Sequence, residues 1–163
     1  MTQEAPILRP SARAILLDPA DRVLLFRIED PRAMDRSFWI TPGGGIEPGE
    51  SDLECLGREI LEETGLSACE LGPLVWLREH IFPWNDRWIR QVERYYFART
   101  QVTDVHAGLQ MEYEMDFLKE ARWWGIDEMA QATSERFVPR DFVRHLEPLL
   151  AGEFPAEPVI VGR

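Results

Sequence analysis

The chain has 163 residues, of which 45% are hydrophobic, so we expect one domain with a sizeable core. Its 29 acidic residues outnumber its 18 basic residues, and the formal net charge is −11. This charge argues against binding of duplex nucleic acid, which needs a basic surface. It does not exclude a small polyanionic substrate held by divalent cations and a few arginines.

The first half of the chain predicts a hairpin followed by a glycine-rich loop. Residues 10–18 and 22–29 are apolar runs that flank a turn signal, as in two paired strands. Residues 30–37 read as an exposed loop. A short strand at residues 38–40 is then stopped by Pro42 and the glycines at 43–45.

A helix is expected after this loop, up to about Thr64. Ser51 followed by Glu54 forms a capping box, and Gly65 suits the left-handed conformation that ends many helices. The expected buried stripe of the helix consists of Leu53, Leu56 and Ile60.

The second half predicts a longer hairpin and two further helices. The expected elements are strands at 71–82, 88–100 and 121–126 and helices at 126–132 and 139–151. We take residues 1–152 as one domain and residues 153–163 as a flexible C-terminal tail.

Cellular context is predicted from what the sequence does not contain. Cys55 and Cys69 form no CxxC pair, and a chain of this length does not need a disulfide, so both are expected to be reduced. The N-terminal residues do not resemble a signal peptide, and no apolar run approaches the roughly 20 residues of a membrane span. We therefore expect a cytoplasmic protein with no membrane segment.

Three carboxylates carry the chemistry of the helix: Glu59, Glu62 and Glu63. Their spacing places them on one side of a helix, where like charges repel unless a cation lies among them. Carboxylates without histidine or cysteine favour hard cations, Mg²⁺ or Mn²⁺. Such a metal would activate water for attack on phosphorus. The sequence has no P-loop, no G-x-S-x-G elbow and no HExxH pattern.

The segment from Gly44 to Leu66 resembles the signature box of the Nudix hydrolases, G-x5-E-x7-R-E-U-x-E-E-x-G-U, where U is aliphatic. Every specified position of that box is present in this segment. The lead-in Trp39-Ile40-Thr41-Pro42-Gly43-Gly44 and the later Arg122-Trp123-Trp124 also resemble the family.

The resemblance implies a fold of the α/β (α+β) class, an α/β/α sandwich with a mixed β-sheet. It implies that Glu59, Glu62 and Glu63 are catalytic metal ligands, with the Gly43 carbonyl as a further ligand. It also implies that the site is supported by four residues of the box: Gly44, Glu50, Arg58 and Gly65. Glu50 would pair with Arg58 and fix the loop against the helix, although Arg58 could also pair with acids one turn away on its own helix.

The resemblance also implies that a further acid from a later loop, here residues 111–119, joins the metals or acts as the base. Glu114 is the first candidate and Glu112 the second, with Asp116 and Glu120 behind them. The general base stays open between Glu59 and Glu114.

Four residues are candidates for substrate binding: Arg27, Arg90, Arg94 and Trp84. The arginines could meet phosphate, with Arg90 and Arg94 on one face of their strand, and the tryptophan could stack on a base. Each has a structural alternative, as a solvated surface arginine or as packing within a hairpin.

The function predicted from these residues is metal-dependent hydrolysis of a diphosphate linkage in a nucleoside diphosphate joined to another moiety. Substrate candidates are nucleoside triphosphates, ADP-ribose, nucleotide sugars and dinucleoside polyphosphates. One alternative is a nucleotide-sensing module that binds without hydrolysis. Another is an isoprenoid diphosphate isomerase, which would need a catalytic cysteine near the site. The expected partner is the small-molecule substrate, and a homodimer is compatible with the sequence.

Overall fold

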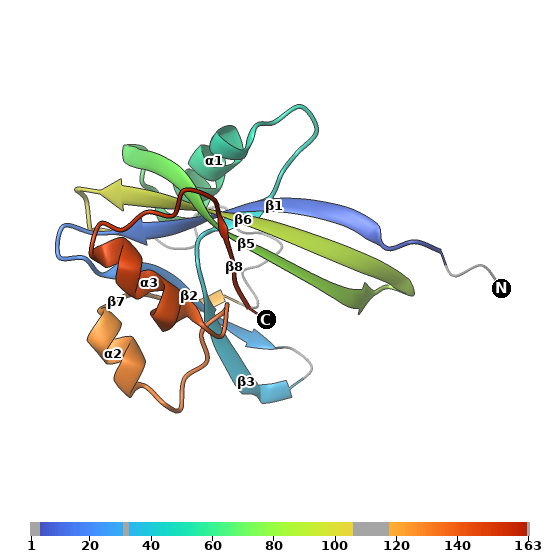
Figure 1. The fold of residues 1–163 in the computed structure, drawn as a ribbon. Coiled ribbons are helices and arrows are strands. Elements are labelled where there is room, and N and C mark those ends of the chain that lie inside the picture. The colour runs from blue at the N-terminus through green and yellow to red at the C-terminus, as the bar shows by residue number, and fades with distance from the viewer. Residues whose placement is uncertain (1–3, 31–32, 106–117, 163) are drawn as a thin grey trace.

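The computed structural model describes residues 4–30, 33–105 and 118–162 (Figure 1). The elements follow in the order β1 (Ile7–Leu17), β2 (Val23–Asp30), β3 (Ala33–Ile40), β4 (Gly43–Gly45), α1 (Asp52–Thr64), β5 (Cys69–Trp84), β6 (Arg87–Thr100), β7 (Leu118–Trp124), α2 (Ile126–Gln131), α3 (Phe142–Leu150) and β8 (Val159–Ile160). The mixed α and β composition confirms the predicted fold class.

The eight strands of the described residues form one mixed sheet in the order β3-β2-β1-β6-β5-β8, with β4 on β1 and β7 on β2. β1 runs parallel to β6 along its whole length, whereas it pairs with β2 only where Leu17 faces Val23. The sheet therefore divides beyond this point, and β4 pairs with β1 at Ser11 to Arg13. This division places the glycine segment beside the centre of the sheet.

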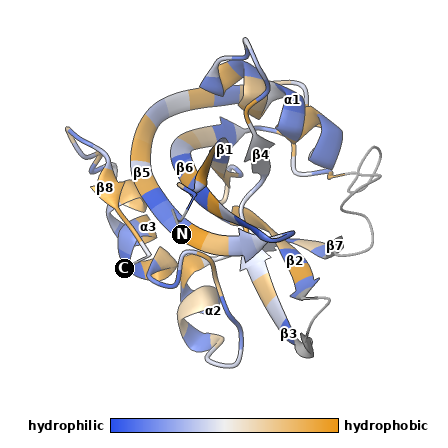
Figure 2. Ribbon diagram, turned by 90° about the vertical axis from the view of Figure 1, so that its right-hand side faces the viewer, coloured by the Kyte–Doolittle hydropathy of each residue, from blue (hydrophilic) through white to orange (hydrophobic). Residues whose placement is uncertain are grey.

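Helices cover both faces of the sheet, with α1 on one side and α2 and α3 on the other (Figures 1 and 2). Under α1 the sheet presents small side chains, including Ala12, Ala14 and Ala98, against Leu56 and Ile60 of the helix. The larger cluster under α2 and α3 is built around aromatic and aliphatic side chains such as Trp76 and Phe142. Small residues under α1 allow its backbone to approach the sheet closely.

The hairpin of β5 and β6, with the start of β1, projects to one side beyond the helices (Figure 1). Its turn consists of Asn85 and Asp86, which both have positive φ, at 46° and 61°. Such two-residue turns match the twist of antiparallel strands. The predicted turn at 83–86 is confirmed, and the strands extend to Trp84 and from Arg87.

Two segments expected to be irregular belong to the sheet instead. Within the predicted loop at 30–37, residues from Ala33 onward belong to β3, which pairs with β2 on one side. On its other side, Trp39 exchanges backbone hydrogen bonds with Arg136 and Val138. Gly43–Gly45 likewise forms a strand, because β1 supplies its backbone partners. For Gly43–Gly45 the partner, β1, is far away in the sequence. β3 pairs with the preceding strand on one side and with the distant residues Arg136 and Val138 on the other.

The C-terminal tail also differs from its prediction, because β8 pairs in parallel with Trp76 and Leu77 of β5. The amide of Val161 donates to the Leu77 carbonyl at 2.9 Å, and the Val161 side chain is only 2% exposed. The tail therefore completes the sheet edge and adds an apolar side chain to the core under α3.

The tail's contribution can be measured by comparing Val161→Ala with Val159→Ala, whose side chain is 36% exposed. Removing two buried carbons from Val161 is expected to lower the free energy of unfolding by about 1–2 kcal/mol. The change at Val159 is expected to cost less than about 0.5 kcal/mol. Urea unfolding of both variants checks this, and equal losses would contradict the packing of Val161.

Candidate active site

The glycine segment, Gly43–Gly45, fits against its neighbours because a side chain at two of its three positions would collide with them. Gly43 has φ 143°, and a Cβ there would collide with the Ala12 carbonyl oxygen. At Gly44, the carboxylate of Glu59 fills the space that a Cβ would take. Any larger residue at Gly44 would therefore displace one of the predicted metal ligands.

The ends of α1 are determined locally, as predicted. Ser51 accepts a hydrogen bond from the Glu54 amide at 3.1 Å, and the Glu54 side chain accepts one from the Ser51 amide. Gly65 adopts the left-handed conformation at φ 75°, and its amide donates to the Leu61 carbonyl at 2.9 Å. These caps satisfy backbone groups that a helix end leaves unpaired.

Arg58 and Glu50 form a bidentate ion pair between the helix and the loop. The Arg58 Nε and Nη2 atoms donate to the two Glu50 oxygens at 2.8 and 2.9 Å. This pairing lowers the pKa of Glu50 to about 2. Arg58 Nη2 also donates to the Gly45 carbonyl at 3.3 Å, so one guanidinium holds two points of the loop. The predicted contact is therefore present.

The three predicted metal ligands of the helix, Glu59, Glu62 and Glu63, occupy different environments. Glu63 is 3% exposed and accepts a hydrogen bond from the Gly43 amide at 3.2 Å. Glu59 and Glu62 are turned toward Arg58, with Nη1 of Arg58 at 3.0 Å from Glu59 and 3.5 Å from Glu62. Burial, together with the adjacent Glu59 carboxylate, raises the pKa of Glu63 well above its ordinary value.

These side chains fit a hard divalent cation by their chemistry. Two carboxylates lie next to each other at Glu59 and Glu63, one of them buried, and a cation would offset their repulsion. Within the described part of the chain, however, no three acidic, histidine or cysteine side chains are gathered around one point. Arg58, which lies against both Glu59 and Glu62, is the cation that meets them here.

The N-terminal turn of α1 departs from the predicted buried stripe. Leu53 is 47% exposed and does not face the sheet. Asp52, one helical turn before Leu56, occupies the sheet-facing position instead. Its carboxylate accepts two hydrogen bonds from Arg94, at 2.5 and 2.6 Å, and one from the Tyr96 hydroxyl at 2.5 Å. The hydrogen bonds from Arg94 lower the pKa of Asp52. Arg94, a candidate for phosphate binding, is therefore bound to the helix.

The other substrate-binding candidates lie in separate places. Arg90 forms a bidentate pair with Glu79 on the projecting hairpin, at 2.8 and 3.0 Å. Trp84 is 56% exposed at the end of β5, beside the hairpin turn. Arg27 on β2 pairs with Glu29 and with Glu120, at 3.7 and 3.3 Å. The structure does not group these residues with the box.

Candidates for the later acid fall mainly outside the described residues: Glu112, Glu114 and Asp116. The fourth, Glu120, lies on β7 and pairs with Arg27. Arg13, which sequence reasoning did not select, contacts the Thr41 and Gly43 carbonyls through Nη1 at 3.1 and 3.4 Å. Its Nε lies 3.5 Å from the buried Glu93. The signal for it was an arginine directly before the apolar run Ala14 to Leu17 of β1.

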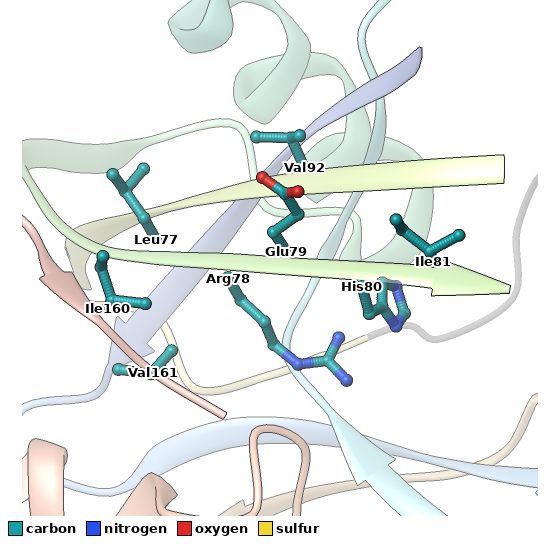
Figure 3. A pocket seen from close by; sticks show the side chains of 8 residues that line it. All are labelled: Leu77, Arg78, Glu79, His80, Ile81, Val92, Ile160 and Val161. Atoms are coloured by element: carbon teal, nitrogen blue, oxygen red, sulfur yellow. The ribbon is translucent and has the colours of Figure 1, made fainter. Parts of the chain in front are cut away.

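A separate hollow of about 600 Å³ lies along β5, where β8 ends (Figure 3). Arg78 and His80 point to one side of β5, whereas Glu79 and Val92 lie on the other. None of its lining residues belongs to the box. No helix among the described residues is long and apolar enough to cross a membrane.

The NUDIX domain family model matches residues 7–146 of this chain, which include the whole loop–helix element. The chain belongs to the NUDIX family. An asymmetrical bis(5'-nucleosyl)-tetraphosphatase from Rattus norvegicus is 34% identical over 93 residues, covering 57% of this chain and 59% of the rat protein. An RNA pyrophosphohydrolase from Wolbachia pipientis is 30% identical over 101 residues, covering 57% of this chain and 62% of that protein. The matches thus span less than two thirds of these NUDIX relatives.

Solved structures show the same NUDIX fold. A MutT protein from Methanosarcina mazei Go1 superposes with a TM-score of 0.64 at 20% identity, over 91% of this chain and 97% of the other. A C. elegans Ap4A hydrolase in a binary complex gives a TM-score of 0.62 at 16% identity, over 88% of this chain and 98% of the other. At these identities the likeness concerns the fold alone.

The environment of Glu63 predicts that Glu63→Gln stabilises the metal-free protein at neutral pH. The folded protein favours the neutral side chain, whereas the unfolded chain ionises near the ordinary pKa of 4.5. The free energy of unfolding of the wild type therefore falls as the pH rises above 4.5, because Glu63 ionises more readily in the unfolded chain. Glutamine at position 63 does not ionise, so the variant lacks this loss. A glutamine can still accept the hydrogen bond from the Gly43 amide.

Urea unfolding in EDTA from pH 4 to pH 8 measures this difference. The variant and the wild type should be equally stable near pH 4, and the variant should be more stable at pH 7 to 8. The control Glu62→Gln removes an ion-pair partner of Arg58, so it is not expected to stabilise. A stability difference at Glu63 that does not vary with pH would contradict the proposed environment.

Proposed function

We propose that this protein is a divalent-metal-dependent hydrolase that cleaves a diphosphate linkage in a nucleotide-like substrate. The observation that carries the proposal is the complete loop–helix element, in which Arg58 joins Glu50 while Glu59 and Glu63 meet beside the glycine segment. Membership of the NUDIX family supports it. The relatives named as a tetraphosphatase and a pyrophosphohydrolase act on acid anhydrides, which is the same reaction class.

Glu59, Glu62 and Glu63 are the proposed ligands of Mg²⁺, with Mn²⁺ as a substitute and the Gly43 carbonyl as a further donor. When bound, the metal supplies an activated water and neutralises charge on the phosphoryl oxygens. Glu63 is held in place by the Gly43 amide, and Glu59 by the space that Gly44 leaves open. Glu50 keeps Arg58 charged and oriented, so that the guanidinium supports the loop without leaving the helix.

The proton acceptor for the attacking water is proposed to be Glu59 or Glu114. Glu59 is 16% exposed and lies at the glycine segment, which places it within the box itself. Replacing each by glutamine separates the two, because the general base carries the acidic limb of the pH–rate profile. The substitution that removes this limb identifies the base.

Dinucleoside tetraphosphates are the substrates to examine first, because the rat protein and a pig protein, 33% identical over 95 residues, are both named for that reaction. Nucleoside triphosphates, oxidised nucleotides, ADP-ribose, nucleotide sugars and 5'-triphosphorylated RNA complete the panel. The box residues bind the diphosphate that all these compounds share. Discrimination among them must come from residues outside the box.

The thiol of Cys55 does not favour the isomerase alternative. Cys55 is fully buried, and its Sγ lies 3.5 and 3.6 Å from the Gly44 and Gly45 carbonyl oxygens. Burial raises its pKa to about 12. A neutral thiol under the glycine loop serves as packing, and a catalytic cysteine would need to reach the substrate.

Hydrolysis of the panel in the presence of Mg²⁺ tests the proposal. At least one member should be cleaved, and Glu62→Gln and Glu63→Gln should each lower kcat by about 10²-fold or more, because each removes a metal ligand. Circular dichroism of both variants checks that the fold is retained. Full activity in EDTA would refute the metal-dependent mechanism, and micromolar nucleotide binding without turnover would favour the sensing alternative.

A further inference from the structure

The position of α1 on the sheet is determined by contacts of two different kinds. Leu56 and Ile60 pack on the alanines of β1 and β6, which sets the distance between helix and sheet. Apolar contacts are non-directional and leave rotation and sliding of a helix weakly determined. Directional contacts are therefore needed to set the direction in which the carboxylates point. Arg58 and Glu63 tie α1 to the loop and to β4, and a further contact is needed to tie it to the body of the sheet.

Asp52 provides that directional contact at the first turn of the helix. Its carboxylate accepts hydrogen bonds from Nε and Nη2 of Arg94, which restrict it to one plane, and the Tyr96 hydroxyl donates a third hydrogen bond. The Asp52 side chain is 21% exposed and that of Arg94 is 30% exposed, so water screens the pair only in part. Both donors come from β6, which pairs with β1 along its full length.

We infer that the Asp52–Arg94–Tyr96 cluster is a positioning device, which sets the rotation of α1 and thereby the placement of Glu59, Glu62 and Glu63 for metal binding. The inference rests on the proposed function of these glutamates. It gives Arg94 a role other than phosphate binding, because its guanidinium is already engaged by the helix. Asp52 lies on the sheet-facing stripe with Leu56, Ile60 and Glu63, so a turn of the helix at Asp52 also moves Glu63.

The same strand face carries a matched control. Arg90, four residues before Arg94 on β6, makes an equally bidentate pair with Glu79. Glu79 lies on β5 along the projecting hairpin (Figure 3). Its pair with Arg90 joins β5 to β6 within the sheet. Asp52→Asn and Glu79→Gln thus each remove the acid of a bidentate pair with an arginine of β6, and only one of these pairs includes α1.

The test is the affinity of the protein for Mn²⁺, measured by calorimetry without any substrate. Asp52→Asn and Arg94→Gln should each weaken Mn²⁺ binding by about 10- to 100-fold, the effect usual for residues that orient metal ligands. The double variant should be little weaker than either single variant, because both remove one interaction. Glu79→Gln should bind Mn²⁺ as the wild type does. Arg94→Lys should restore only part of the affinity, since lysine cannot pair with both oxygens.

If Asp52→Asn does not fold, Tyr96→Phe removes one hydrogen bond while keeping the ring, and a smaller loss of Mn²⁺ affinity is expected. Wild-type affinity in Asp52→Asn, or an equal loss in Glu79→Gln, would overturn the inference. So would a wild-type protein that binds no Mn²⁺. On any substrate that is cleaved, positioning predicts a lower kcat with little change in KM, whereas phosphate binding by Arg94 predicts a raised KM. Shifts in Mn²⁺ affinity without turnover of any substrate would refute the proposed function alone.

Discussion

The guanidinium of Arg58 connects the loop that precedes α1 to the helix itself. Ile46 of this loop packs against the core under α1, and hydrogen bonds help to set the shape of the remaining residues. Two of these connect Arg58 to Glu50 and a third connects it to the Gly45 carbonyl. The same side chain lies against Glu59 and Glu62, which without it would be neighbouring charges on a partly buried helix face. One arginine thus shapes the loop and offsets the charge of the proposed ligands.

The buried carboxylate of Glu63 shows how the site and the stability of the fold oppose each other. A charged group that is 3% exposed is costly unless it is compensated, and the adjacent Glu59 adds to that cost. The Gly43 amide and the positive charge of Arg13 offset only part of it. The fold tolerates this arrangement because the rest of α1 is well anchored, by Leu56 and Ile60 on the sheet and by Asp52 at its first turn. Such local strain is typical of sites that are completed by a ligand.

The loop–helix element could be predicted from sequence because its information is local: Ser51 with Glu54, Gly65 at the end, and the fixed spacing of the box. Features that depend on distant partners were missed. β4 and β8 form because β1 and β5, far away in the sequence, supply their backbone partners. Leu53 is exposed because Arg94 and Tyr96 bind Asp52 on the sheet side. Hydrophobic periodicity identifies the buried stripe of a helix. It does not show that Asp52, rather than the adjacent Leu53, faces the sheet and pairs with an arginine there. Arg13 was missed for the same reason, since its partners lie 28 to 80 residues away.

The proposed metal site requires Glu59, Glu62 and Glu63 to bind one cation while Arg58 supports them. Anomalous diffraction from a crystal soaked in Mn²⁺ tests this most directly, because it locates the metal without relying on any substrate. The account predicts a peak within coordination distance, about 2.0–2.3 Å, of oxygens from Glu59, Glu62 and Glu63. It also predicts that Arg58 stays bonded to Glu50. A well-occupied peak bound elsewhere, with these carboxylates unliganded, would contradict the account.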